Sequence, residues 1–193
     1  MLLDLVKKAR SVRGFREERK VTDEELRYLV ECARYTPSAR NAQVLKYRLV
    51  NTPEELRQVQ PLTKWAGALP ELNLPFPGTC PQAFIVICQD YRLSDSANAF
   101  QKDVGIAAQT MLLAANDLGL GGCMILSFQA GALKNTLGLP EYLMPQLVLA
   151  LGAPMEDIRV VDVDDSGSVA YYRDGENVHY VPKRTLEELI IQK

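Results

Sequence analysis

The sequence predicts a β-sheet packed against helices, of the α/β or α+β class. Three apolar-rich runs, at residues 83–88, 123–126 and 146–151, have the length of buried strands. Helical patterns separate these runs, so helices and strands alternate along the chain. With 193 residues, of which 47% are hydrophobic, the chain is expected to form one domain that spans residues 1–193.

The longest helical pattern, at residues 103–118, is apolar on nearly every face. Between residues 106 and 115 only Gln109 and Thr110 are polar. A helix of this kind is expected to be buried nearly all round. A domain of this size can bury it only if other layers or a second subunit cover it. Gly119 follows as a residue that ends helices.

Composition excludes several classes of protein. The formal net charge of −2 gives the chain no nucleic-acid signature. No apolar run approaches the roughly 20 residues that span a bilayer, and the N-terminus has no apolar signal region. We therefore expect a cytoplasmic protein without membrane or nucleic-acid partners. The four cysteines form no CxxC pair, which favours buried free thiols over a metal site or disulfides.

A short first helix leads into a basic segment. Residues 1–20 carry seven basic and three acidic side chains, so positive charge is concentrated at this end of the chain. Arg10 and Arg13 flank the hydroxyl of Ser11, and arginine binds phosphate through two parallel hydrogen bonds. The segment is either a solvated basic face or an anion site.

The second helix begins with a capping box formed by Thr22 and Glu25. Residues 36–43 follow it as a polar loop before an apolar-rich strand at 44–50. Within this loop Ser38, Asn41 and Gln43 offer one hydroxyl and two carboxamides. The loop is either an ordinary connection or a contact region for a polyhydroxylated ligand.

A third helix begins at Thr52, with Pro53 in its first position. Five prolines then interrupt residues 61–81, and this segment is long enough to form a lid or the wall of a pocket. Trp65 within it either packs on a flat ligand or anchors a core or interface.

The C-terminal part of the chain contains a short helix at 132–137, the strand at 146–151 and an unusual tail. The tail has an acidic turn at 162–165, and Thr185, with Glu188 three residues later as in a capping box, begins a last amphipathic helix. An extended tail that ends in a helix often docks on a partner chain. Lys183 and Arg184 form a second basic pair, which either converges with the first on one phosphate or lies on the surface.

Five motifs, in this order, resemble the FMN-dependent nitroreductase family. They are RSVRGF, TPSARNAQ, the stretch DVGIAAQTMLLAANDLGLGGC, the pair LGLPEYL and LVLALGAP, and the closing PKRTLEEL. The match covers most of the chain. The resemblance implies an α+β fold with a mixed sheet flanked by helices, in an intertwined homodimer with the long helix at its centre. It also implies two FMN molecules at the subunit interface, and residues 160–193 would form a tail that docks on the partner protomer.

The resemblance assigns cofactor-binding roles to eleven residues. One protomer would hold FMN through its N-terminal basic segment, and the partner would contribute the polar loop. Two residues after the long helix would pass close to the flavin ring, and the second basic pair would lie near the phosphate. The residues are Arg10, Ser11, Arg13, Pro37, Ser38, Asn41, Gln43, Gly122, Cys123, Lys183 and Arg184.

The chemistry implied by the resemblance takes place on the flavin. NADH or NADPH would pass hydride to flavin N5 and leave, and a nitroaromatic or quinone-like small molecule would then take the electrons. No side chain is assigned as a general acid or base, and no metal is expected. Arg13 would stabilise negative charge at the pyrimidine end of the ring.

Two features leave other activities open. The family often has Gln-Pro-Trp where this chain has Gln43-Val44-Leu45, and residues 61–81 match no family motif. The alternatives are another flavin reaction on the same scaffold, such as dehalogenation, dehydrogenation or flavin fragmentation, and a flavin-binding protein with little turnover.

Overall fold

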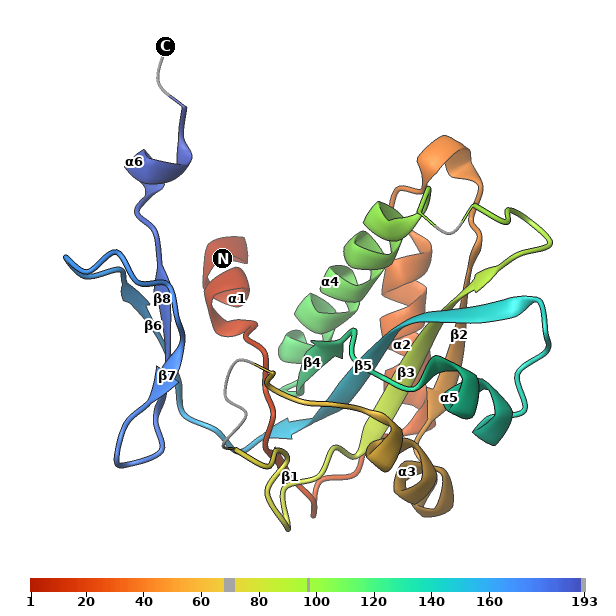
Figure 1. Cartoon of the computed structure of the whole chain (residues 1–193), viewed down its shortest axis with the longest axis horizontal. Coiled ribbons are helices and arrows are strands. Elements are labelled where there is room, and N and C mark those ends of the chain that lie inside the picture. Colours follow the sequence, from red (N-terminus) through yellow and green to blue (C-terminus); the bar gives the residue numbers. More distant parts are fainter. Residues whose placement is uncertain (68–71, 97, 192–193) are drawn as a thin grey trace. The chain divides into compact units, whose positions relative to one another are not determined.

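The computed structural model describes residues 1–67, 72–96 and 98–191. The chain divides into two compact units, Met1–Pro154 and Met155–Lys193. The first unit contains, in order, α1 (Leu2–Lys8), β1 (Phe15–Arg16), α2 (Asp23–Arg34), η1 (Ala39–Asn41), β2 (Leu45–Val50), α3 (Pro53–Val59), η2 (Gln60–Leu62), β3 (Ala83–Asp90), α4 (Gln101–Asp117), β4 (Gly121–Ile125), α5 (Ala130–Thr136) and β5 (Leu143–Pro154) (Figure 1).

The sheet of the first unit is organised around β5. Strand β3 pairs with one edge of β5, and β2 continues the sheet beyond β3. The other edge of β5 pairs with β4 and then with β1, whose Phe15 lies opposite Pro154. All these strand pairs are antiparallel.

Helices cover both faces of this sheet. Every residue of β3 is buried, as expected for a strand with a layer on each side. Ile85 and Ile87 on one face join the core that α2 and α4 build with β5. Phe84 and Val86 point to the opposite face and are also fully buried. Figure 1 shows α3 and α5 on that second side.

Helix α4 is buried on one face and open on another. The predicted stripe is buried at Val104, Ala108, Met111 and Ala115. However, Ile106 is 40% exposed, so the expectation of burial nearly all round is wrong for the single chain. The physical reason is that α2 and α1 pack against only part of the helix circumference.

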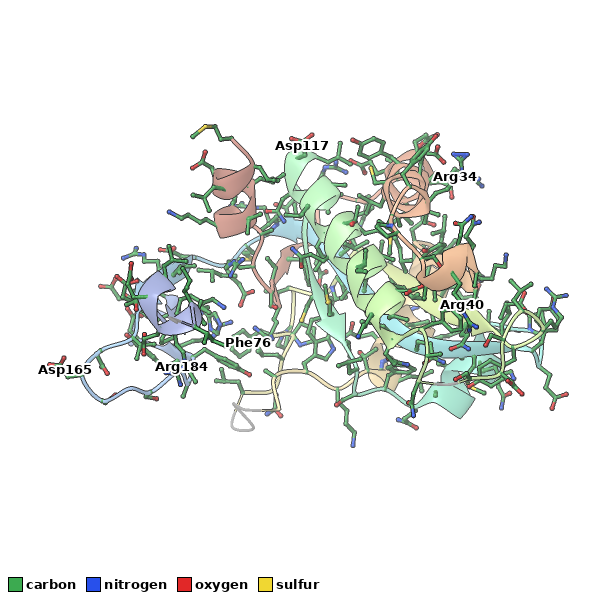
Figure 2. All side chains as sticks on the ribbon, turned by 90° about the horizontal axis from the view of Figure 1, so that it is seen from above. Arg34, Arg40, Phe76, Asp117, Asp165 and Arg184 are labelled. Atoms are coloured by element: carbon green, nitrogen blue, oxygen red, sulfur yellow. The ribbon has the colours of Figure 1, made fainter. Side chains whose placement is uncertain are left out.

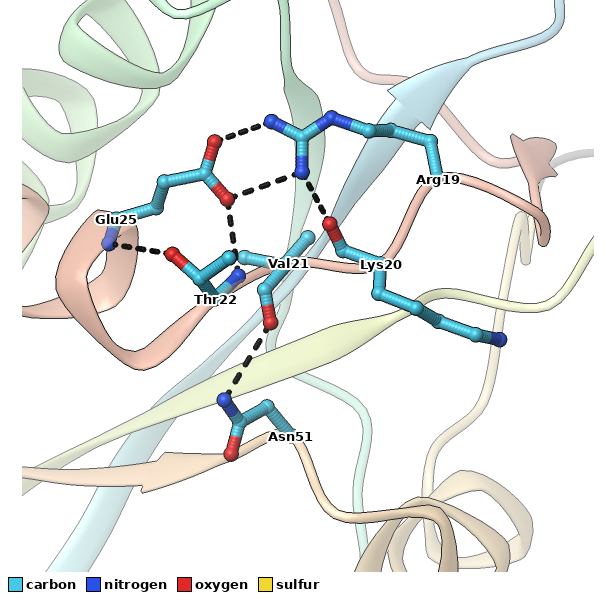
Figure 3. A network of polar contacts seen from close by, with 6 residues as sticks. All are labelled: Arg19, Lys20, Val21, Thr22, Glu25 and Asn51. Atoms are coloured by element: carbon cyan, nitrogen blue, oxygen red, sulfur yellow. Dashed lines mark hydrogen bonds and ion pairs between the residues drawn. The ribbon is translucent and has the colours of Figure 1, made fainter.

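A network of polar contacts fixes the start of α2 (Figure 3). Thr22 and Glu25 form the predicted capping box, and Arg19 binds both carboxylate oxygens of Glu25. The hydrogen bond from Arg19 lowers the pKa of Glu25. Asn51, at the end of β2, donates to the carbonyl oxygen of Val21 at 3.4 Å, which ties this helix to the sheet.

Several predicted bounds of strands and helices are wrong. The strand expected at 146–151 runs from Leu143 to Pro154, because β1 pairs with residues 153–154 and keeps the chain extended. The strand expected at 123–126 begins at Gly121 and ends at Ile125, and Leu126 is exposed. Helix α5 begins two residues before the predicted start.

The second unit forms a small sheet of its own. It contains β6 (Ile158–Asp162), β7 (Tyr172–Arg173), β8 (His179–Lys183) and α6 (Leu186–Leu189). Strand β8 pairs in parallel with β6 and antiparallel with β7, so this sheet is mixed. The expected tail therefore contains a sheet as well as its last helix, and its docking on a partner protomer stays a prediction. The ion pair between Arg173 and Glu156 is buried, and it holds the unit together internally.

Part of the 61–81 segment has regular contacts; residues 68–71 within it lie outside the described part of the chain. Thr63 pairs with Phe128 through an isolated bridge. Trp65 is partly buried, donates to the Thr63 hydroxyl at 2.9 Å and meets Phe15 edge to face. These contacts show Trp65 anchoring the segment to the first unit.

All four cysteines are free, but only Cys88 and Cys123 are buried. The expectation of burial is wrong for Cys32 and Cys80, which lie partly at the surface. The described residues contain no cluster of His, Cys, Asp or Glu side chains placed to hold a metal ion. No helix in the described part of the chain is long and apolar enough to cross a membrane.

Candidate functional site

Two groups of predicted site residues come together in the first unit at the start of β4. Ser11 bridges to Gly122 in parallel, and the amide of Val12 donates to the Gly122 carbonyl at 3.0 Å. The basic segment therefore runs alongside the strand that carries Gly122 and Cys123. We call Arg10, Ser11, Arg13, Gly122 and Cys123 the basic half-site.

The guanidinium groups of both arginines in the basic half-site donate to backbone carbonyls nearby. Arg10 donates to the Val6 carbonyl at 2.7 Å, and its buried Nε has no hydrogen-bond partner among the described residues. Arg13 donates to the Ser11 carbonyl at 3.3 Å. Both arginines are partly buried, and the Ser11 residue between them is exposed. Two guanidinium groups and a hydroxyl form a donor set suited to a phosphate or another polyoxygenated anion.

Gly122 and Cys123 were expected after the long helix, and they lie inside β4, because β5 pairs with them. A Cβ at Gly122 would lie 2.5 Å from the Ala150 carbonyl oxygen, so only glycine fits beside this strand. The Cys123 side chain is buried, so a ligand near this residue meets its backbone.

The remaining residues predicted in the first unit lie on the loop between α2 and β2. Ser38 donates to Asp103 Oδ2 at 2.8 Å, and the amide of Ala39 donates to the same oxygen at 3.0 Å. The amide of Gln43 in turn donates to the Ser38 hydroxyl at 3.0 Å. We call Pro37, Ser38, Asn41, Gln43 and Asp103 the polar half-site.

Asp103 was missed as a site residue in the sequence. It is 6% exposed, in the first turn of α4. One signal could have found it, because a carboxylate at the start of an otherwise apolar helix needs a partner when it is buried. The hydroxyl of Ser38 is that partner.

The backbone of the polar half-site is strained. Arg40, Asn41 and Gln43 have φ angles of 54°, 53° and 47°. This left-handed region costs a non-glycine residue roughly 1–2 kcal/mol. Pro37, Asn41 and Gln43 are exposed, so the loop presents its proline ring and both carboxamides to the surface.

A cavity of about 280 Å³ lies behind this loop, lined by α2, β2 and Asp103. Leu45 and Tyr47 of β2 contribute to its wall. Burial raises the pKa of Tyr47, and the charge of Asp103 adds to the rise. Val44 is fully buried, so of the two residues that replace Pro-Trp only Leu45 lines the cavity.

The two half-sites meet α4 at different heights. Asp103 lies in its first turn, whereas Gly122 packs beside Leu112, since a Cβ at Gly122 would lie 2.8 Å from that side chain. Nine residues of helix separate Asp103 from Leu112, which is about 13 Å along the axis. Figure 2 shows Arg40 of the polar loop and Asp117 at opposite ends of α4.

Lys183 and Arg184 belong to the second unit, at the end of β8 and just after it. Both are exposed. Arg184 contacts Glu188 of α6 at 3.4 Å, and Thr185 and Glu188 form the predicted capping box. A meeting of these two cations with the basic half-site stays a prediction.

Comparison with known proteins gives a consistent family. The profile described as "Nitroreductase family" matches residues 6–153. A protein of Archaeoglobus fulgidus named NADH dehydrogenase/NAD(P)H nitroreductase is 27% identical over 168 residues, which are 84% of this chain and 91% of the relative.

Solved structures share the fold. A protein of Parabacteroides distasonis, also named NADH dehydrogenase/NAD(P)H nitroreductase, has a TM-score of 0.64 and 26% identity, over 80% of this chain and 87% of its own. A structure from Clostridium difficile named FMN-dependent nitroreductase has a TM-score of 0.66 and 22% identity, over 86% and 94%. The second likeness shows the fold alone.

Proposed function

This chain belongs to the nitroreductase family of NAD(P)H oxidoreductases, and from that premise we propose that it is an FMN-dependent enzyme. It takes hydride from NADH or NADPH and reduces a nitroaromatic or quinone-like acceptor in a ping-pong sequence. The observation that carries the proposal is the convergence of Arg10, Ser11 and Arg13 with Gly122 in the basic half-site.

The residues present fit FMN. The buried Nε of Arg10 has no partner among the described residues, and the guanidinium of Arg10 and the hydroxyl of Ser11 suit a single terminal phosphate. The sequence has no GxGxxG dinucleotide fingerprint, which favours FMN over FAD. The Clostridium difficile structure of the same fold is named FMN-dependent, which supports this choice.

We propose that the chain works as a homodimer. Two helices that contact each other carry exposed apolar side chains: α4 at Ile106 and at Leu118, the residue that caps its end, and α1 at Leu2 and Leu3. Gly105 lies inside α4, where glycine costs about 1 kcal/mol relative to alanine. A Cβ there would meet no heavy atom within 4 Å of the same chain. Close approach by the partner's helix explains why glycine stands at this position.

The dimer also accounts for the separation of the half-sites. On one chain they lie about 13 Å apart along α4. We propose that each flavin lies between the basic half-site of one protomer and the polar half-site of the other. The second unit, with Lys183 and Arg184, adds positive charge near the phosphate as a docked tail.

FMN, when bound, supplies the hydride and electron transfer. The protein's own residues bind and orient. Arg10 and Ser11 hold the phosphate end, and Arg13 places positive charge where negative charge develops during reduction. Asn41 and Gln43 offer donors and acceptors to neutral polar edges. No side chain is needed as a general acid or base.

The spectrum of the purified protein tests this function. We expect a yellow protein that releases FMN on unfolding, identified by chromatography. Anaerobic addition of NADH or NADPH should bleach the visible absorption, and a nitroaromatic or quinone should restore it. Released FAD would disprove the choice of cofactor. A protein that NAD(P)H does not bleach would be a flavin binder without this turnover.

Product analysis in the presence of oxygen separates acceptor reduction from dehalogenation, dehydrogenation or flavin fragmentation.

A matched pair of glycine variants tests the dimer. Gly105 and Gly131 both lie in helices, and a Cβ at either position meets no heavy atom within 4 Å. We expect Gly105→Gln to shift the sedimentation of the protein from dimer towards monomer, whereas Gly131→Gln leaves the dimer intact. Equal behaviour of the two variants would remove α4 from the interface.

A further inference from the structure

We propose that Asp103 is a positioning residue for the flavin site. It holds the polar loop in the conformation that Pro37, Ser38 and Asn41 need to reach the partner's cofactor. The inference rests on the proposed function, and it adds a residue that lies behind the loop and does not itself touch the ligand.

The contacts of Asp103 fix the loop near both of its ends. One carboxylate oxygen accepts from the Ser38 hydroxyl at 2.8 Å and from the Ala39 amide at 3.0 Å. The Ser38 hydroxyl then accepts from the Gln43 amide at 3.0 Å. A relay of three hydrogen bonds therefore links the helix to residues 38, 39 and 43.

The loop has only short backbone hydrogen bonds of its own, around η1, and the relay adds a tie to α4. Three of its residues, Arg40, Asn41 and Gln43, hold left-handed φ angles that side chains disfavour. Asn41 and Gln43 themselves are exposed, so their own packing does little to fix them. A buried carboxylate with charge-assisted hydrogen bonds is a stronger restraint than a neutral group in the same place.

Asp103 lies on the same part of α4 as the residues proposed to meet the partner chain. Gly105 and Ile106 follow within three residues, on the part of α4 that is open to a partner. The helix that meets the second chain therefore also sets where the loop lies. The carboxylate transmits the placement of this helix to the side chains that the loop offers to the partner's flavin.

A purely structural role for Asp103 must be separated from a positioning role. An acid in the first turn of a helix also stabilises that helix. Asp90 is a suitable control, because it is 1% exposed and holds a loop by accepting from the Arg92 amide at 3.1 Å. Asp90 belongs to neither half-site. Asp90→Asn removes a buried carboxylate that holds a different loop and that is also paired with Arg92 at 2.7 Å.

The experiment compares Asp103→Asn, Ser38→Ala, the double variant and Asp90→Asn. We measure the Kd for FMN by fluorescence titration, the circular dichroism of the bound flavin, and amide exchange of residues 38–43. Loss of a charged hydrogen bond is expected to raise the Kd by about 10-fold or more in Asp103→Asn, and to speed exchange in the loop. The double variant should bind no more weakly than Asp103→Asn, because both changes break the same relay. Asp90→Asn should lower Tm and leave the Kd unchanged.

The failures are distinguishable. If wild type binds no FMN, the proposed function fails and takes this inference with it. If wild type binds FMN and Asp103→Asn binds it equally well, only the inference fails. Strictly multiplicative effects of the two single changes, or an equal loss in Asp90→Asn, also overturn it.

A second comparison decides the matter if Asp103→Asn does not fold. Ser38→Thr keeps the hydroxyl that donates to Asp103, whereas Ser38→Ala removes it. We expect the threonine variant to retain the Kd and the loop protection far better than the alanine variant. Equal values for both variants would show that the hydrogen bond to Asp103 does not position the loop.

Discussion

The two half-sites of this protein are built in opposite ways. The basic half-site lies against the sheet, where backbone pairing between Ser11 and Gly122 sets its position. The polar half-site lies on a connecting loop with left-handed residues, where side-chain contacts to Asp103 set its position. One half offers cations, and the other offers a hydroxyl and carboxamides.

Because the two half-sites are fixed differently, substitutions in them are expected to have different effects. Backbone pairing fixes the basic half-site, so a variant that loses one arginine side chain keeps the geometry of the backbone. Such a variant therefore measures the effect of the lost charge on binding. A loop fixed through one hydroxyl and one carboxylate loses its geometry together with either group. The two halves also sit at different heights on α4, so only a second chain brings unlike halves together around one flavin in the proposed dimer.

The largest expected effect comes from mixing chains with defects in different halves. Arg13→Ala and Asn41→Ala, each strengthened until nearly inactive alone, are unfolded and refolded together in equal amounts. Random pairing makes about half the dimers mixed, and each mixed dimer has one site with both intact residues. About a quarter of wild-type sites should therefore return, measured as NAD(P)H oxidation with a quinone.

Tagged chains provide the control for this experiment, because they show whether the subunits have exchanged fully. If both residues served one site within a single chain, every site would keep a defect. Mixing would then restore no activity despite full exchange.

An intermediate effect separates the halves by charge. Arg13→Ala removes a charged hydrogen bond, so the Kd for FMN should rise by about 10- to 150-fold. Asn41→Ala removes a neutral one, which corresponds to roughly 2- to 12-fold. Titrations at several ionic strengths sharpen the contrast, since salt screens exposed charges. The salt dependence of the Kd should weaken in Arg13→Ala and persist in Asn41→Ala. The same salt dependence in both variants would contradict the proposal that the basic half-site binds FMN through its charge.

The smallest effect tests the strain in the polar loop. Arg40→Gly places glycine at a φ of 54°, which should stabilise the protein by about 1 kcal/mol. For a chain of this size the Tm should rise by about 2–4 °C. Arg27→Gly is the matched control in the middle of α2, and it should cost about 1 kcal/mol. Thermal unfolding measures both; a fall in Tm for Arg40→Gly would mean that the arginine side chain supports the loop.

Local signals in the sequence were enough for much of the fold. The capping boxes at Thr22 and Thr185 and the apolar run at 83–88 depend on neighbouring residues, and the structure confirms them. The confirmed family membership came from motifs spread along the chain. The convergence of the basic segment with Gly122 followed only from the family resemblance.

Long-range pairings explain what the sequence did not reveal. Strand β1 has two residues, Phe15 and Arg16, which pair with Pro154 and Ala153 of β5 far along the chain, so no local pattern marks either end. The small mixed sheet of the second unit arises because β8 pairs in parallel with β6, across a segment that includes β7, and antiparallel with β7. In the sequence Asp103 is one of several polar residues at the start of a helix. Its role becomes visible only in the fold, which brings Ser38 within hydrogen-bond distance of it. The roles of the eleven predicted binding residues stay predictions.

The central place of β5 also sets an order of events during synthesis. The strand is the last element of the first unit to leave the ribosome, yet β3, β4 and β1 all pair with it. Before residue 154 emerges, the sheet can form little more than the β2–β3 pair. The apolar faces of β3 and α4 therefore lack their main packing partner, β5, until late in the synthesis of each chain. Assembly of the core is delayed to a late step of translation, when holdase chaperones have most to protect.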